Sequence, residues 1–191
     1  MCPLAVALRF GTVYVTSTHG AFFCMTKFKV LFVCMGNICR SPTAHGVFRQ
    51  KVIENGMAHE VQVDSAGTHN YHPGSPPDVR SQAHAAKRGY DLTDLRARQI
   101  QALDFELFDL ILVMDWDNLA LVRDQCPPAQ QFKVRRLTEF CLQLDSPVVP
   151  DPYYGGKNGF EAVLDLVEDA CEGLILHVRQ QGYSVSKGND L

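Results

Sequence analysis

Residues 30–43 read V-L-F-V-C-M-G-N-I-C-R-S-P-T, and the rest of the chain is organised around this stretch. Its first four residues are apolar, which predicts a buried strand over residues 29–33. Ser41 and Pro42 are typical of the N-cap and the first position of a helix. A glycine-containing loop between a strand and a helix turns backbone N–H groups inward, and the helix N-terminus adds partial positive charge. The stretch therefore predicts an anion site.

Cys34 and Arg40 stand at the two ends of this loop, with five residues between them. A thiol attacks phosphorus only as the thiolate, which a helix N-terminus, backbone N–H groups and a guanidinium all favour. The same donors can hold a phosphoryl group, and Arg40 can bind two of its oxygens at once. Gly36 has no Cβ to block close approach, and Asn37 tolerates a positive φ. A Cys-x5-Arg pair alone arises by chance, but the whole string indicates a nucleophilic phosphate site.

The elements along the chain alternate between strand and helix patterns. Strands are expected over residues 29–33, 60–64, 110–114 and 132–136, and helices over 42–55, 77–88, 115–126 and 159–181. This alternation predicts an α/β fold with a parallel sheet covered by helices on both faces. Ligands of such sheets bind beyond the carboxyl ends of the strands, where Cys34 falls. The long loop over residues 66–77 is expected beside the site.

The string C-M-G-N-I-C-R-S-P over residues 34–42 resembles the signature of the low-molecular-weight protein tyrosine phosphatases. Further matches follow in family order: D-S-A-G-T over residues 64–68, Met114-Asp115 with Asn118, and D-P-Y-Y-G-G over residues 151–156. The likeness covers about residue 25 to the C-terminus. It implies a Rossmann-like three-layer sandwich with a four-stranded parallel sheet, and a phosphate loop between its first strand and first helix. It also implies hydrolysis of phosphotyrosine.

Three residues are expected to carry the chemistry. Cys34 is the candidate nucleophile that forms a phosphocysteine intermediate. Arg40 is expected to bind phosphoryl oxygens and to stabilise five-coordinate phosphorus. Asp151 is expected to protonate the leaving phenolate and then to activate water, because one carboxyl can serve both steps. An isolated Asp-Pro is more often a turn, and only its combination with the Cys34 string favours the catalytic interpretation.

The substrate is expected to contact the loop and a rim of tyrosines. A flat aromatic rim from Tyr153 and Tyr154 suits a phosphotyrosine ring, although a pair of partly exposed loop tyrosines is an equal alternative. The resemblance places Tyr71 on the opposite wall of the cleft. The candidate substrate-binding residues are thus Met35, Gly36, Asn37, Ile38, Cys39, Ser41, Tyr71, Tyr153 and Tyr154.

Several residues near the loop have two interpretations. Ser41 can cap the helix or, as a hydroxyl beside Cys34, can stabilise the thiolate as a leaving group. Cys39 can capture an oxidised Cys34 as a disulfide, or it can be a small buried residue. Asn37 and Ser65 are expected to hold the loop in shape. Asp115 and Asn118 are expected to cap the helix over residues 115–126.

Composition limits the function. The chain has 191 residues, enough for one domain, and a net charge of −3, which argues against general nucleic-acid binding. Its seven cysteines form no C-x2-C pair, so neither a zinc site nor a secreted disulfide framework is indicated. No metal and no cofactor are expected, because the loop and Arg40 supply the positive charge. A cytoplasmic protein that does not contact membranes is expected.

Residues 1–24 are expected to form an extension outside the domain, disordered or loosely docked. Met25 would make an ordinary start, so the upstream residues are consistent with a start site assigned too early. A short targeting sequence or an extra edge strand is the alternative. The phosphatase domain is expected to span residues 25–191.

Other activities remain open. An arsenate reductase of this fold would need a further cysteine pair, and no cysteine lies between Cys39 and Cys126. A protein arginine phosphatase is similar, but Ile38 stands where such members carry the smaller threonine. A phosphate-binding module without catalysis is the non-enzyme alternative, although both Cys34 and Asp151 are present. The expected partner is a phosphotyrosine protein, with a bacterial tyrosine kinase as one candidate.

Overall fold

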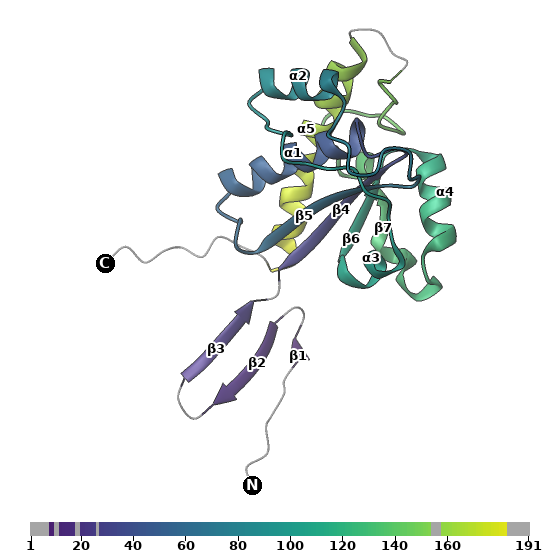
Figure 1. The fold of residues 1–191 in the computed structure, drawn as a ribbon. Helices are drawn as coiled ribbons and strands as arrows, with labels where there is room; N and C mark the ends of the chain where they lie inside the picture. Colours follow the sequence, from purple (N-terminus) through teal and green to yellow (C-terminus); the bar gives the residue numbers. More distant parts are fainter. Residues whose placement is uncertain (1–7, 10–11, 18–19, 26, 154–157, 183–191) are drawn as a thin grey trace.

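The structure is a computed structural model that describes residues 8–9, 12–17, 20–25, 27–153 and 158–182. At its centre four parallel strands lie in the order β5-β4-β6-β7 (Figure 1). The strands are β4 (Phe28–Cys34), β5 (Val61–Gly67), β6 (Leu110–Val113) and β7 (Val134–Arg136). The predicted four-stranded parallel sheet is confirmed, and Cys34 is the last residue of β4, as expected.

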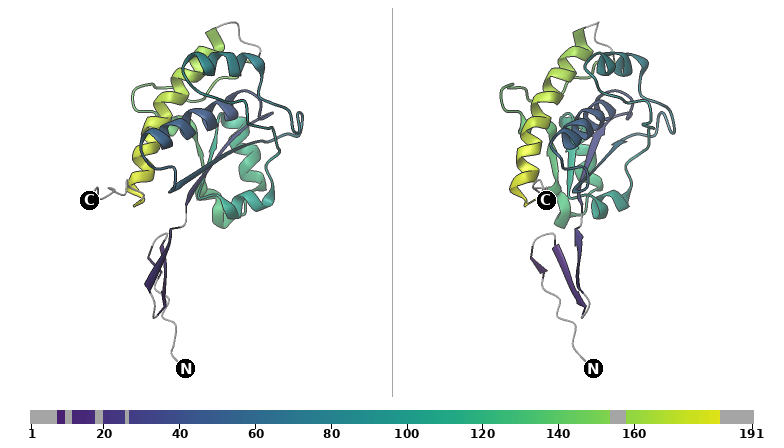
Figure 2. Two further views of the ribbon diagram at one scale, coloured as in Figure 1. Left: turned by 60° about the vertical axis from the view of Figure 1, so that its left-hand side comes forward. Right: turned by 90° about the vertical axis from the view of Figure 1, so that its left-hand side faces the viewer.

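Helices cover both faces of this sheet (Figure 2). One face carries α1 (Arg40–Glu54) and α5 (Asn158–Gln180), with α2 (Val79–Lys87) packed against both helices. The other face carries α3 (Ala102–Leu107) and α4 (Trp116–Gln125). The three-layer α/β fold is therefore confirmed. None of the helices that the structure describes is long and apolar enough to cross a membrane.

The alternation of side chains along β4 explains why both faces are covered. Val30, Phe32 and Cys34 belong to the core that includes α1 and α5, whereas Leu31 and Val33 belong to the core under α3 and α4. All five residues are at most 3% exposed. A strand with apolar residues on both faces needs a layer on each side, because successive side chains point to opposite faces. The apolar run that opens the sequence motif thus places Cys34 at the C-terminal end of a strand that is covered on both faces.

The last helix packs so closely on its neighbour that it requires a glycine. A Cβ on Gly173 of α5 would lie 2.0 Å from the carbonyl oxygen of Phe140. Phe140 ends the 3-10 helix η2 (Leu137–Phe140), which precedes the loop that carries Asp151. The small residue lets α5 and this segment approach backbone to backbone, and so the region that leads into the Asp151 loop is anchored on the core.

Three predicted boundaries were wrong. Helix α1 begins at Arg40 with Cys39 as its N-cap, and Cys39 makes no side-chain capping bond. Ser41 is therefore not the N-cap; it lies in the first turn, where the N–H groups have no intrahelical partner and Pro42 is tolerated. Strand β7 begins at Val134 and not at residue 132, because residues 128–133 form the 3-10 helix η1 that starts with Pro128. Strand β5 continues to Gly67, beyond the expected end at residue 64.

The N-terminal segment contains three short strands: β1 (Leu8–Arg9), β2 (Thr12–Ser17) and β3 (Gly20–Met25). They pair with one another in an antiparallel sheet and do not join the four-stranded sheet. The alternative of an extra edge strand is therefore wrong for these strands. The domain boundary near residue 25 stays a prediction.

Candidate active site

The loop between β4 and α1 leaves a set of backbone donors without protein acceptors. Its carbonyl groups are engaged: the N–H of His69 donates to Met35 O at 3.0 Å, and that of Asp78 donates to Ile38 O at 2.8 Å. In contrast, the backbone N–H groups of residues 36–39 donate to no acceptor in the part of the chain that the structure describes. Asn37 adopts a positive φ of 55°, the conformation expected of it. Donors without a protein acceptor therefore lie just after Cys34 in the sequence, and Cys34 is 3% exposed.

A neighbouring glycine allows the loop to take this shape. A Cβ on Gly67, at the end of β5, would lie 2.8 Å from the carbonyl oxygen of Met35 and 3.0 Å from that of His69. Any side chain there would push the loop out of position. The D-S-A-G-T string is therefore part of the site through packing, which its sequence alone did not reveal. Gly36 itself is less constrained, because its nearest clash would be His72 at 3.3 Å.

Side chains behind the loop form a hydrogen-bonded chain that ends at the Cys34 sulfur. Asn37 Nδ2 donates to Ser41 Oγ at 2.9 Å and to Ser65 Oγ at 3.0 Å. Ser41 Oγ lies 3.1 Å from Cys34 Sγ. Because the Asn37 amide occupies a lone pair of Ser41 Oγ, the single hydroxyl proton can be directed at the sulfur or at the carbonyl oxygen of Ala66, 3.3 Å away. Ser41 Oγ thus faces Cys34, Asn37 and Ala66 and caps no helix N–H group.

His45 closes this chain and was not singled out from the sequence. Its Nδ1 lies 3.4 Å from Ser65 Oγ, and the residue is 7% exposed. Burial lowers the pKa of His45 to about 4, so the imidazole is neutral near pH 7. A neutral ring can hold the Ser65 hydroxyl without adding charge behind the thiol. One helical turn separates His45 from Ser41, which is the signal that sequence reading could have used.

Arg40 is almost fully buried, at 2% exposed, and it gathers two carboxylates. Its Nη1 donates to Asp115 Oδ2 at 2.5 Å and to the carbonyl of Val149 at 3.2 Å. Its Nη2 donates to Asp151 Oδ2 at 2.8 Å. Burial alone would lower the pKa of Arg40, but the negative groups of Cys34, Asp115 and Asp151 raise it above its ordinary value. Arg40 therefore stays charged at the base of the site.

Asp115 has a double role that the sequence indicated only in part. It is the N-cap of α4, as predicted, and its Oδ1 accepts the backbone N–H of Asn118 at 2.7 Å. Its other oxygen binds Arg40, a contact that the sequence reading did not assign. One carboxylate thus fixes both the helix start and the orientation of the guanidinium.

Asp151 lies in a segment, residues 147–153, that we call the acid loop. The N–H of Val149 donates to Met114 O at 2.8 Å, which ties the loop to the end of β6. The N–H of Tyr153 donates to Asp151 Oδ1 at 3.0 Å. The Asp151 side chain is 40% exposed, so it is both oriented and open to a ligand. The structure brings Asp151 to Arg40 and the loop that holds Cys34, as predicted.

A cavity of about 220 Å³ lies at the mouth of this arrangement. Its lining consists of Met35, Gly36, Ile38, Tyr71, His72, Asp151 and Tyr153. Tyr71 and Tyr153 both reach the cavity, as expected, whereas Tyr154 lies outside the described residues. Asn37, Cys39 and Ser41 are at most 5% exposed and do not line it. Their side chains support the loop from behind, and only their backbone can face a ligand.

Comparison with known proteins shows which family has this fold and this sequence. The sequence model of the low molecular weight phosphotyrosine protein phosphatases matches residues 29–184. The chain belongs to this family. A low molecular weight protein-tyrosine-phosphatase of Streptomyces coelicolor is 44% identical over 157 residues, which cover 81% of this chain and 95% of the relative. A crystal structure of a protein tyrosine phosphatase from Entamoeba histolytica, with Hepes in its active site, has a TM-score of 0.79 and 40% identity over 82% of this chain and 99% of its own.

One structural relative is named for a different substrate. The crystal structure of an arginine phosphatase from Drosophila has a TM-score of 0.73 and 31% identity, covering 80% of this chain and 98% of its own. Fold and family membership therefore do not by themselves separate the two kinds of substrate. The side chains around the cavity have to be weighed for that purpose.

Cys39 is enclosed more tightly than the redox interpretation requires. It is 5% exposed, and burial raises its pKa to about 12. Cys34 and Cys39 are both free thiols. A thiol with a raised pKa is a poor nucleophile toward an oxidised partner. The structural role of Cys39, as N-cap residue and loop filler, is thus the better supported of the two interpretations.

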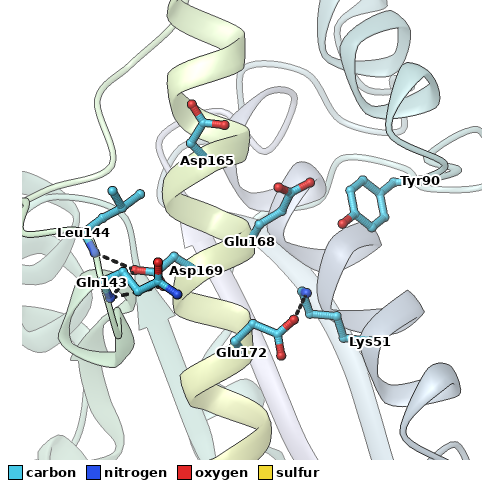
Figure 3. A pocket seen from close by; sticks show the side chains of 8 residues that line it. All are labelled: Lys51, Tyr90, Gln143, Leu144, Asp165, Glu168, Asp169 and Glu172. Atoms are coloured by element: carbon cyan, nitrogen blue, oxygen red, sulfur yellow. Dashed lines mark hydrogen bonds and ion pairs between the residues drawn. The ribbon is translucent and has the colours of Figure 1, made fainter.

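A larger cavity elsewhere does not suit a phosphate. It measures about 400 Å³ and is lined on α5 by Asp165, Glu168, Asp169 and Glu172 (Figure 3). Asp169 accepts backbone N–H groups of residues 142–144, and Glu172 pairs with Lys51. A wall of carboxylates repels an anion. Size alone would therefore point to the wrong cavity for this family's chemistry.

Among the described residues no three His, Cys, Asp or Glu side chains are grouped as metal ligands.

Proposed function

We propose that this phosphatase hydrolyses phosphotyrosine in proteins through a phosphocysteine intermediate. Cys34 is the nucleophile, Arg40 binds the phosphoryl group, and Asp151 is first the general acid and then the general base. The observation that carries the proposal is that the backbone N–H groups of residues 36–39 donate to no acceptor in the described part of the chain. These residues lie between the Cys34 thiol and the buried guanidinium of Arg40 in the sequence. Donors that lack protein partners at the start of a helix are those of an anion site.

Substrate binding exchanges one partner of Arg40. In the resting site Nη2 donates to Asp151 Oδ2, at 2.8 Å. A phosphoryl oxygen takes over this hydrogen bond, and the Asp151 carboxyl is released to turn toward the ester oxygen. Asp115 stays on Nη1 and keeps the guanidinium in its plane. Charge-assisted bonds of this kind are short and directional, so they align phosphorus with the sulfur.

In the first step the Cys34 thiolate attacks phosphorus, and the bond from phosphorus to the tyrosine oxygen breaks. Protonated Asp151 gives its proton to that oxygen, so neutral tyrosine leaves. The backbone donors and Arg40 stabilise the charge on the equatorial oxygens. The products of this step are phosphocysteine, tyrosine and an ionised Asp151.

In the second step water attacks phosphocysteine, and the ionised Asp151 takes a proton from that water. The sulfur–phosphorus bond breaks and returns the Cys34 thiolate with inorganic phosphate. The Ser41 hydroxyl, 3.1 Å from the sulfur, stabilises the thiolate as it leaves. Both steps therefore use the same carboxyl in opposite protonation states.

The cavity walls support an aryl substrate. Tyr71 is 60% exposed and Tyr153 is 43% exposed, and both line the cavity with Ile38. Two aromatic side chains can stack on or against a tyrosine ring that enters between them. The family implies phosphoprotein substrates, and a bacterial tyrosine kinase remains our candidate partner in the cytoplasm. The Drosophila relative makes phosphoarginine the second candidate substrate, against which the branched Ile38 argues by its bulk.

Two other activities are less well supported. An arsenate reductase passes oxidation to further cysteines, yet Cys126 lies in the core under α3 and α4, and Cys171 in the core under α5. A binding module without catalysis requires neither the Cys34 thiol nor the exposed Asp151 carboxyl that pairs with Arg40.

The test is metal-free hydrolysis, in EDTA, of p-nitrophenyl phosphate, phosphotyrosine, phosphoserine and phosphoarginine by the wild type and Cys34→Ser. We expect turnover of the two aryl phosphates only, lost in Cys34→Ser, which still binds vanadate. Preferred turnover of phosphoarginine would mean that phosphoarginine, and not phosphotyrosine, is the substrate. Activity that persists in Cys34→Ser would overturn the proposed mechanism. Phosphate binding without any turnover would leave the binding module, with arsenate as the next substrate to test.

A further inference from the structure

Arg80, the second residue of α2, has its guanidinium fixed by its neighbour Asp78. Asp78 is the N-cap of α2, and its Oδ1 accepts from Arg80 N at 2.8 Å and from Nε at 3.0 Å. Its Oδ2 accepts from Nη2 at 2.8 Å. This paired contact sets the plane of the guanidinium although the Arg80 side chain is 44% exposed. An exposed arginine is usually mobile, so this degree of fixation indicates a specific role.

The free end of the guanidinium reaches the acid loop. Arg80 Nη1 donates to the carbonyl of Tyr153 at 3.2 Å. Arg80 Cζ lies 5.2 Å from the centre of the Tyr153 ring and 4.9 Å from that of Phe160 in the first turn of α5. Both distances fall within the range of cation–π attraction. Arg80 thus binds the backbone and the ring of one residue of the acid loop, and the start of the helix that follows it.

The other end of this unit is tied to the phosphate loop. The backbone N–H of Asp78 donates to Ile38 O at 2.8 Å. On the far side, the N–H of Tyr153 donates to Asp151 Oδ1 at 3.0 Å. A continuous path therefore runs from Ile38 through Asp78, Arg80 and Tyr153 to the carboxyl of Asp151.

We propose that Arg80 is a positioning residue that holds the general acid Asp151 at a fixed distance from the phosphate loop. It acts through Tyr153 and does not touch the reacting atoms. When the substrate displaces Asp151 from Arg40, the Tyr153 N–H is the contact that still orients the carboxyl, and Arg80 keeps Tyr153 in place. The proposal rests on the function assigned above to Asp151.

Arg80 is not needed to dock α2 on α5, because other residues of α2 and its C-cap do so. His84 stacks on Phe160 with ring centres 5.5 Å apart and pairs with Glu161. Arg88 pairs with Glu161, and also with Asp165 at 2.8 Å and Glu168 at 3.0 Å. Arg88 touches α5 but not the acid loop. It therefore provides a matched control for loss of an arginine between these two helices.

The experiment compares kcat/KM for phenyl phosphate, whose leaving group needs a proton, with that for 2,4-dinitrophenyl phosphate, whose leaving group does not. The proteins are the wild type, Arg80→Ala, Arg80→Lys, Arg88→Ala, Asp151→Asn and Arg80→Ala with Asp151→Asn. For Arg80→Ala we expect about a tenfold loss on phenyl phosphate and less than about a twofold loss on the activated ester, because general acid catalysis is worth about 10²–10⁴-fold. Arg80→Lys keeps the charge but lacks the planar guanidinium that bonds both Asp78 and Tyr153, so its loss on phenyl phosphate should be only partly smaller than that of Arg80→Ala.

Three outcomes decide the proposal. Arg88→Ala should leave the ratio of the two kcat/KM values unchanged, and in the Asp151→Asn background Arg80→Ala should add no further change to that ratio. An equal loss on both substrates, or an Arg88→Ala effect of the same size, would mean that Arg80 is merely structural. If the single variant Asp151→Asn has the same ratio as the wild type, the acid assignment, and not the role of Arg80, is wrong.

Discussion

Asp115 and Arg40 form an ion pair with an N–O distance of 2.5 Å, in which the Arg40 side chain is 3% exposed and that of Asp115 is 23% exposed. The two residues are 75 positions apart in the sequence. Because Asp115 also caps α4, the guanidinium is fixed to the start of a helix on the opposite face of the sheet. The group that we propose binds the phosphoryl oxygens is thereby set in place before a substrate arrives.

The first prediction concerns this pair. Asp115→Asn keeps an N-cap side chain but replaces a charged acceptor by a neutral one. We expect kcat/KM for p-nitrophenyl phosphate to fall about tenfold or more, because a hydrogen bond to a charged group contributes about 1.5–3 kcal/mol. Asp117→Asn, in the first turn of the same helix, is the control and should change kcat/KM by less than twofold, roughly the scale of a surface charge. Equal values for Asp115→Asn and the wild type would contradict the proposed orientation of Arg40.

A second prediction separates the two steps through Ser41. In Ser41→Ala the leaving thiolate of the second step loses its hydroxyl partner, while the first step keeps Arg40 and Asp151. We expect phosphocysteine to accumulate, seen as a burst of one equivalent of nitrophenolate per enzyme followed by slow turnover. Ser146→Ala removes a half-buried hydroxyl just before the acid loop, far along the chain from Cys34, and should leave the burst as in the wild type. A slow first turnover without a burst would assign Ser41 to the attacking step instead.

The third prediction is a pH dependence of stability that arises from His45. Burial lowers its folded-state pKa to about 4, below the 6.5 of an unperturbed histidine. The unfolded chain therefore binds the proton first, so stability falls as pH decreases from about 6.5 to about 4. The shift corresponds to a loss of about 3–4 kcal/mol across this window, at about 1.4 kcal/mol per pKa unit.

Urea unfolding at several pH values between 7 and 4 tests this dependence. His45→Gln should flatten the fall in the free energy of unfolding, and His59→Gln, at an exposed position, should not. The same slope in His45→Gln and the wild type would show that other groups cause the acid sensitivity.

The part of the site that is continuous in sequence could be predicted, and the part that depends on tertiary contact could not. Cys34, Asn37 and Arg40 lie within seven consecutive residues. The strand pattern before them, the glycine among them and the helix start after them together predict their arrangement. The contacts of Arg40 with Asp115, of His45 with Ser65, and of Arg80 with Tyr153 join segments that no local pattern connects. Their residue types, an acid, a buried histidine and an arginine, have many other uses in proteins.

The fold followed the same rule. Apolar runs such as residues 110–114 indicate a doubly covered strand, because a strand buried on both faces has apolar side chains at successive positions. The errors lie at element ends, where side-chain contacts override local preference. Ser41 is a good N-cap residue, but it lies within the first turn, where its hydroxyl contacts Cys34, Asn37 and Ala66. Phe132 has strand propensity, yet it follows Pro128 in a 3-10 helix and is 75% exposed.

The last prediction concerns the choice between phosphotyrosine and phosphoarginine. Ile38 lines the cavity beside Tyr71, and its branched side chain narrows the space next to the phosphate loop. Ile38→Thr removes apolar volume and adds a hydroxyl that can accept from a guanidinium N–H. We expect the ratio of kcat/KM for phosphoarginine to that for phosphotyrosine to rise by about tenfold, since one hydrogen bond to a charged group contributes about 1.5–3 kcal/mol. Ile38→Val removes volume without a hydroxyl, so a small rise in that variant and a large one in Ile38→Thr would assign selectivity to polarity. Equal rises would assign it to space alone, and no rise in either variant would move the selectivity from the phosphate loop to the tyrosines at the mouth.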